Sequence, residues 1–235
     1  MKTTLTHPRL GEITLSRTRR ARRITLCVKP DGEVRLSIPY TATREAGFRF
    51  LESKIEWVEG CRRKMAERFP ERPLLPPYAT RRHTLQLEAA DTDRIRVRLT
   101  AERIEVRHPA ALPPDDEAVQ QAIRQGIREA LRAEAKELLP ERLAVLAARH
   151  GFRAGKVTIR ATVSKWGSCS ARNDFSLSLY LLLLPDRLID YVLLHELCHT
   201  VHKNHGPRFH ALLDSLCGGE SARLNRELKN FRPQI

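Results

Sequence analysis

A short segment near the C-terminus has the residue types and spacing of a catalytic metal site: His195-Glu196-Leu197-Cys198-His199. On a helix, side chains four residues apart lie on the same face, with Cβ atoms about 5–6 Å apart. The two imidazoles can therefore reach one metal ion at about 2.0–2.1 Å, the usual zinc–nitrogen distance. Glu196 lies between them in sequence, where it can take a proton from the activated water. The segment predicts zinc-dependent hydrolysis, with one Zn²⁺ per chain and Glu196 as the general base.

Catalytic zinc usually has three protein ligands, and His205 is the preferred third ligand. On an unbroken helix, His205 would lie about 9 Å beyond His199 at about 1.5 Å per residue, too far to share the metal. The chain is therefore expected to turn after His199. Asn204 and Gly206 accept left-handed backbone, and Pro207 suits the first turn of a new helix. These residues allow His205 to fold back to the metal.

Two other residues compete for the third ligand position. His202 lies three residues past His199, but on a continuing helix it points to the next turn, so it is expected beside the site or at the surface. Cys198 could supply a thiolate. A free Cys often behaves as a small buried hydrophobe, and core packing is preferred for it.

The segment Ser164-Lys165-Trp166-Gly167-Ser168-Cys169-Ser170 is unusual for a purely structural turn. Trp166 could form a wall of the cleft or stack on a substrate, and the Ser168 hydroxyl could orient substrate groups. A hairpin turn with a packed Trp is the alternative. Strands expected over 156–163 and 175–182 flank the segment, and either could hold an extended substrate along its edge. The alternative is that both strands belong only to the core of the sheet.

The metal-binding motif is expected on a buried helix. Pro185 suits its first turn. Apolar residues then recur with helical spacing: Leu188, Ile189, Val192, Leu193 and Leu197.

The remaining pattern predicts an α+β protein with two domains. Residues 1–110 form a β-rich N-terminal region with one long helix, over 44–68, and Pro30-Asp31-Gly32 is expected as a hairpin turn. Residues 115–235 form the hydrolase domain, which begins with a long helix over 117–150. Pro140 is expected to kink or split that helix, and Gly151 to cap it.

Composition limits the partners and the compartment. The net charge of +14 favours polyanions such as nucleic acid, and an Arg-rich surface without such a partner is the alternative. A basic run lies between two expected strands: Arg17, Arg19, Arg20, Arg22 and Arg23. The five cysteines form no CxxC pair, so neither a zinc ribbon nor a disulfide framework is indicated. Without a signal pattern or a long apolar run, a cytoplasmic protein outside the membrane is expected.

At several of these motifs the chain resembles the YgjP-like family of predicted metal-dependent hydrolases, relatives of the SprT-like and WLM zinc metallopeptidases. The matching segments are Arg22–Leu26 with Pro30-Asp31-Gly32, Trp166–Ser170, Asp190–Val192 with the His195–His199 motif, and His205 with Phe209. The resemblance implies a zincin-like second domain, with a small antiparallel sheet beside the HExxH helix. It implies zinc ligands at His195, His199 and His205, and a catalytic base at Glu196.

The leading functional prediction is a zinc metallopeptidase that uses a zinc-activated water. A zinc-dependent nucleotide phosphohydrolase of the pyrophosphatase type is the second reading, which Arg-rich surroundings of the site would favour. A nucleic-acid-binding module with a structural metal is the third, and it would require a closed site with four protein ligands.

Overall fold

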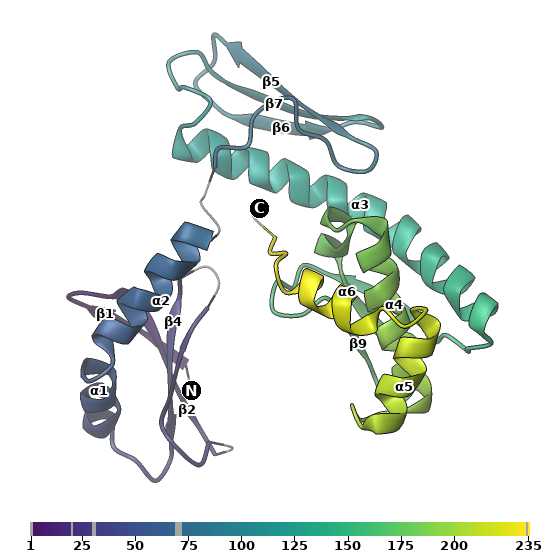
Figure 1. Cartoon of the computed structure of the whole chain (residues 1–235). Coiled ribbons are helices and arrows are strands. Elements are labelled where there is room, and N and C mark those ends of the chain that lie inside the picture. Colours follow the sequence, from purple (N-terminus) through teal and green to yellow (C-terminus); the bar gives the residue numbers. More distant parts are fainter. Residues whose placement is uncertain (1, 20, 30–31, 69–71, 234) are drawn as a thin grey trace. The chain divides into compact units, whose positions relative to one another are not determined.

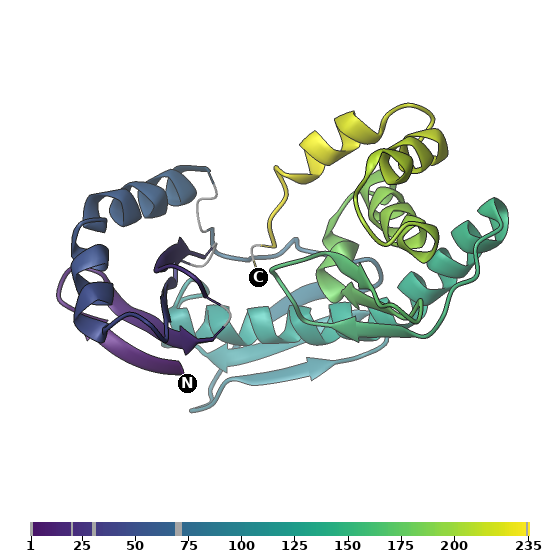
Figure 2. The ribbon, with the colours of Figure 1, turned by 90° about the horizontal axis from the view of Figure 1, so that it is seen from below.

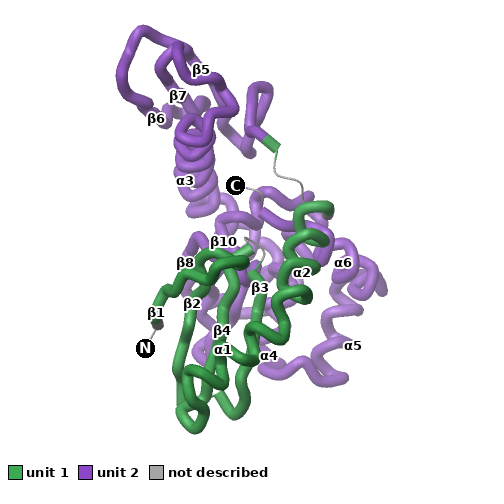
Figure 3. Tube along the Cα trace, turned by 90° about the vertical axis from the view of Figure 1, so that its left-hand side faces the viewer, with its two compact units in different colours: residues 1–72 green, residues 73–235 purple. Residues whose placement is uncertain are grey.

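A computed structural model of the chain describes residues 2–19, 21–29, 32–68, 72–233 and 235. Contacts divide the chain into two units, Met1–Arg72 and Pro73–Ile235 (Figure 3). Each unit has its own hydrophobic core. The sequence placed the boundary later, at residues 110–115. The division falls earlier because Leu85 and Ile104, from strands assigned to the first domain, share a core with the helix that opens the second.

Unit 1 begins with a four-stranded mixed sheet of order β1-β2-β4-β3. The strands are β1 (Lys2–His7), β2 (Gly11–Thr18), β3 (Thr25–Val28) and β4 (Val34–Pro39). Strands β2 and β4 are parallel, and the other pairs are antiparallel. The β2–β3 connection therefore crosses the end of β4, at Pro39. Strands β3 and β4 form the predicted hairpin, in which Gly32 has φ +79°; Pro30 and Asp31 lie outside the described residues.

The single helix expected over 44–68 is two helices, α1 (Arg44–Glu52) and α2 (Ile55–Arg68). Thr43 caps α1 by accepting a hydrogen bond from the Ala46 amide at 3.1 Å. The interruption lies at Ser53, the C-cap of α1, whose hydroxyl donates to the Phe50 carbonyl at 2.8 Å. Such a side-chain bond competes with the helical ladder.

Unit 2 begins with a three-stranded sheet packed on a long helix (Figure 2). The strands are β5 (Thr84–Ala90), β6 (Arg96–Leu99) and β7 (Arg103–Pro109), in the order β5-β7-β6. Helix α3 (Glu117–His150) is continuous through Pro140, so of the predicted kink or split the split is excluded. Asp116 caps its start, and Gly151 ends it in the predicted left-handed conformation, with φ 72°.

The second sheet of unit 2 lies beside the C-terminal helices. It contains β8 (Val157–Arg160), β9 (Gly167–Cys169) and β10 (Phe175–Ser178), in the order β8-β10-β9. The prediction of an antiparallel sheet is wrong, because β8 and β10 are parallel. The segment expected to be a turn supplies β9, which takes the antiparallel position beside β10. The strand expected over 175–182 ends at Ser178, where the 3₁₀ helix η1 (Leu179–Leu183) begins.

Three helices complete unit 2: α4 (Asp186–Val201), α5 (Pro207–Leu216) and α6 (Ser221–Leu228) (Figure 1). The chain is therefore an α+β protein with small mixed sheets. Within the described residues, no helix is long and apolar enough to cross a membrane.

A buried carboxylate joins α3 to the segment before β5. Glu134 is 1% exposed. It accepts hydrogen bonds from the Thr80 hydroxyl, from the amides of Arg81 (3.2 Å) and Arg82 (3.0 Å), and from the His83 ring (2.7 Å). One side chain thus fixes the start of β5 against the middle of α3.

Candidate metal centre

The three candidate histidines come from α4 and the turn after it. His195 and His199 lie in the last two turns of α4, whose buried face includes Leu193 and Leu197. The helix ends at Val201, and α5 begins at Pro207, so the predicted break is confirmed.

The break uses no left-handed residue, contrary to expectation. His202 is extended, with φ −120° and ψ 101°, and Gly206 is extended as well. The His202 amide bonds to the Cys198 carbonyl at 2.8 Å and completes the last helical turn. The chain reverses between these two extended residues and carries His205 back towards α4.

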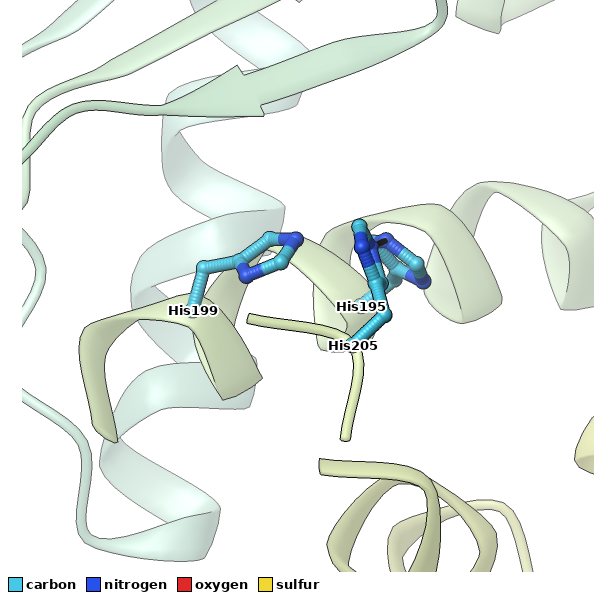
Figure 4. Close-up of side chains that lie close together, drawn as sticks. All are labelled: His195, His199 and His205. Carbon is cyan, nitrogen blue, oxygen red and sulfur yellow. Dashed lines mark hydrogen bonds between the residues drawn. The ribbon is translucent and has the colours of Figure 1, made fainter. Parts of the chain in front are cut away.

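The structure brings His195, His199 and His205 together (Figure 4). Their ligand atoms all lie within 4.8 Å of one another, and no fourth His, Cys, Asp or Glu joins them in the described part of the chain. The Nε2 atoms of His195 and His205 are 3.1 Å apart. Two nitrogens bound tetrahedrally at about 2.0–2.1 Å would be roughly 3.3 Å apart. The spacing therefore fits a shared metal ion.

Phe209 supports all three imidazole rings. This side chain is fully buried. The centroid of its ring lies 4.9 Å from that of His195, 4.6 Å from His199 and 4.8 Å from His205. Sequence reasoning assigned Phe209 no role and named it only as part of the family resemblance. Its place in the first turn of α5, close after His205, is the feature that could have indicated a contact with the histidines. A rigid aromatic platform limits the ring orientations that the histidines can adopt.

Hydrogen bonding and burial prepare the rings for metal binding. The His199 Nδ1 lies 3.1 Å from the His202 carbonyl and donates to it, which leaves the His199 Nε2 for a metal. His202 thus acts through its main chain. Burial lowers the pKa of His195 to about 4, and the neighbouring His199 and His205 add to this shift. At neutral pH the His195 ring is therefore uncharged, the form that binds metals.

Glu196 is a buried carboxylate on the same helix. It is 6% exposed, and its Oε2 atom has no hydrogen-bond partner among the described residues. Burial raises the pKa of Glu196 to about 7, although Lys165 and the Cys169 backbone act in the opposite direction. A carboxylate that titrates near neutral pH can both accept and release a proton.

Strand β9 forms one wall of the site. A Cβ added at Gly167 would lie 2.8 Å from the Cγ and Oε1 atoms of Glu196, so only glycine leaves room for this carboxylate. Strand β9 is at the edge of its sheet and lies beside α4. Strand β9, helix α4 and the segment after α4 line an open cavity of ≈ 330 Å³, with the lining residues Gly167, Ser168, Cys169, His195, Glu196, His199, Lys203 and His205.

The identity of this edge strand corrects the sequence analysis. Of the two strands expected to border a substrate, β10 is central and pairs on both sides. Strand β8 is an edge strand, but none of its residues lines the cavity. The strand that borders the cavity is β9, whose turn-like residues from Gly167 to Cys169 pair with β10.

The other predicted residues lie at different distances from the cavity. Ser168 lines it, and its hydroxyl accepts a hydrogen bond from Lys165 at 2.9 Å. Trp166 packs against the core and is not among the lining residues. Cys198 is fully buried, and burial raises the pKa of its thiol to about 12. It therefore packs as a neutral core residue.

Lys203 lines the cavity and was not singled out from the sequence. Its ammonium donates to the Ser170 carbonyl at 3.0 Å and to Asn173 Oδ1 at 2.5 Å. It thereby links the segment after α4 to the β9–β10 turn. No sequence signal marked it, because both partners are thirty or more residues away.

Three imidazoles around one point, with a buried carboxylate beside them on the same helix, are the arrangement of a metal-dependent hydrolase. The chain belongs to the YgjP-like family: the model described as YgjP-like, metallopeptidase domain, matches residues 22–231. The resemblance to this family is thus confirmed.

Two solved structures are similar to part of the chain. One is the metallopeptidase zymogen of Pyrococcus abyssi abylysin, with 21% identity and a TM-score of 0.36, covering 42% of this chain and 100% of that one. The other is the metallopeptidase zymogen of Methanocaldococcus jannaschii jannalysin, with 21% identity and a TM-score of 0.32, covering 38% of this chain and 96% of that one. No match was found among curated proteins.

Proposed function

We propose that this protein is a zinc-dependent metallopeptidase whose second unit is zincin-like. His195, His199 and His205 hold one zinc ion per chain, and Glu196 is the general base. The observation that carries the proposal is the convergence of three histidine nitrogens within 4.8 Å of one another, beside a buried carboxylate. Three ligands with no fourth among the described residues fit an open catalytic site better than a closed structural one.

Zinc bound to three imidazoles would polarise a substrate carbonyl and lower the pKa of water towards ~7. Glu196 accepts a proton from the attacking water and passes it to the leaving amine. Both transfers need a pKa near the working pH, which burial provides. Gly167 leaves the space in which the carboxylate can stay close to the reacting atoms.

The lining of the cavity favours a peptide over a nucleotide. Its walls are an edge strand and a helix, and its only cationic side chain other than the histidines is Lys203, among the described residues. Lys165 adds a second ammonium beside the lining, where it donates to Ser168. The phosphohydrolase reading requires arginine, the residue best suited to bidentate phosphate binding, and no arginine lines the cavity among the described residues. The main chain of β9 can instead pair with an extended peptide. Ser168 contacts the substrate in this proposal, and Trp166 supports β9 from behind.

Metal content tests the ligand assignment. We expect about one zinc per wild-type chain by elemental mass spectrometry, and a strong reduction in His205→Ala. The matched control is His202→Ala, which should keep its zinc because His202 contributes only a main-chain carbonyl. Zinc retained in His205→Ala and lost from His202→Ala would reverse the assignment. A metal-free wild type, purified without chelators, would refute the zinc site.

The Gly167→Ala variant tests the space reserved for Glu196. The added methyl must displace the carboxylate, and a displacement of about 1 Å can cost roughly 10²-fold in rate. We expect that loss in peptide hydrolysis, with zinc content unchanged. Gly60→Ala is the control, because a Cβ there meets nothing within 4 Å. Wild-type activity in Gly167→Ala would show that the position of Glu196 is not critical.

A further inference from the structure

Four exposed arginines lie near the end of β2 or in the connection from β2 to β3, at one end of the unit 1 sheet, and are here called the basic cluster: Arg17, Arg19, Arg22 and Arg23. The sheet order explains why these residues gather. The β2–β3 connection has to pass over the end of β4, so the arginines of this connection collect there. Arg20, from the same run, lies outside the described residues.

The structure adds an aromatic residue to this cluster. Tyr40 directly follows β4, at the end that the connection crosses. It is 51% exposed. The guanidinium carbons of Arg17 and Arg19 lie 5.2 Å and 5.8 Å from the centroid of its ring. Both distances are within the range of cation–π contacts.

Arg17 is held in place by the main chain. Its guanidinium donates to the carbonyls of Tyr40 at 2.9 Å and Ala42 at 3.1 Å. These bonds orient the side chain without neutralising its charge. All four arginines are exposed, and none of them forms an ion pair with any described residue. The basic cluster is therefore an uncompensated positive patch around a partly exposed aromatic ring.

We propose that unit 1 binds single-stranded nucleic acid at the basic cluster. A base stacks on the Tyr40 ring and its neighbouring guanidinium planes, while the arginines contact successive phosphates. A single strand is required because duplex bases are already stacked and cannot reach an aromatic side chain. Base stacking depends on no 2′-hydroxyl, so RNA and DNA both fit. The proposal does not rest on the metal centre, which lies in unit 2.

Fluorescence anisotropy of the full chain with labelled single strands of about 16 nucleotides measures this binding directly. RNA and DNA strands, a duplex of the same length and phosphatidylserine vesicles are the probes. We expect both single strands to bind more tightly than the duplex. Removing three arginines, in Arg19→Gln/Arg22→Gln/Arg23→Gln, should reduce the slope of log affinity against log salt by about 2, at roughly 0.7 per lost contact.

The Tyr40→Leu variant separates stacking from charge. It should weaken single-strand binding by at least about fivefold and leave the salt slope unchanged, whereas Tyr40→Phe should bind like the wild type. The bonds of Arg17 go to main-chain carbonyls, so both variants retain them. The charge control is Arg128→Gln/Arg132→Gln/Arg153→Gln, which removes three exposed arginines from unit 2.

Three results would overturn the proposal. The first is an equal loss of affinity in the unit 2 control, since binding would then reflect net charge alone. The second is unchanged affinity in Tyr40→Leu. The third is binding to the vesicles without binding to single strands, which would make the basic cluster a membrane-surface site.

Discussion

In the Glu196→Gln variant, peptide hydrolysis is expected to fall by roughly 10²–10⁴-fold, the usual contribution of a general base. The amide has nearly the size of the carboxylate but cannot accept the proton. Glu196 is not one of the three proposed metal ligands, which are histidines, so the zinc content of this variant should equal that of the wild type. Steady-state hydrolysis of a peptide library, with elemental analysis of the same samples, measures both quantities.

The control for this variant is Glu129→Gln, on the exposed side of α3. It makes the same chemical change away from the cavity and should hydrolyse peptides like the wild type. Undiminished hydrolysis in Glu196→Gln would refute the assignment of Glu196 as the general base. Loss of zinc together with activity would instead make Glu196 a residue that maintains the metal centre.

The largest effect on stability is expected from Glu134→Ala. The change removes one acceptor group from four donors, two of which are backbone amides in the segment before β5. A buried donor left without its acceptor costs about 1–3 kcal/mol, so the loss of an acceptor shared by several donors is expected to cost about 3–5 kcal/mol in total. We expect the free energy of unfolding of unit 2 to fall by that amount. Urea titration followed by Trp166 fluorescence, in a Trp57→Phe background, reports on unit 2 alone.

Glu137→Ala is the matched control, three residues further along α3. Its carboxylate pairs with Arg82, and both side chains are exposed. Such surface pairs contribute about 0–1 kcal/mol, so this variant should unfold nearly like the wild type. If the two variants lowered the free energy of unfolding by the same small amount, Glu134 would not hold β5 to α3.

Features set by local sequence could be predicted. The bounds of α3 match the prediction from Glu117 to His150, because Gly151 ends the helix in a left-handed conformation. The gathering of His195, His199 and His205 also followed from spacing, since a helix places the first two and a break is needed for the third. Their role as zinc ligands stays a prediction until metal is measured.

Features set by packing could not be predicted. The roles of Gly167 and Phe209 depend on which atoms meet them from other segments. The sequence of β9 is typical of a turn, and it forms a strand because it pairs with β10. The basic run contains no aromatic residue, and only the crossing over β4 brings Tyr40 to it. The helix break at Ser53 reflects one competing hydrogen bond that a periodicity argument does not consider.

The length of β9 has a consequence for solubility as well as for binding. An open edge that can accept a peptide can also accept a strand of another molecule, and long exposed edges promote aggregation. Strand β9 is only three residues long, and its sequence is Gly-Ser-Cys. In the proposed function, three residues would offer main-chain groups to a short stretch of substrate but little surface for sheet growth between molecules. Under that proposal, this shortness would combine an edge for substrate with little surface for pairing between molecules.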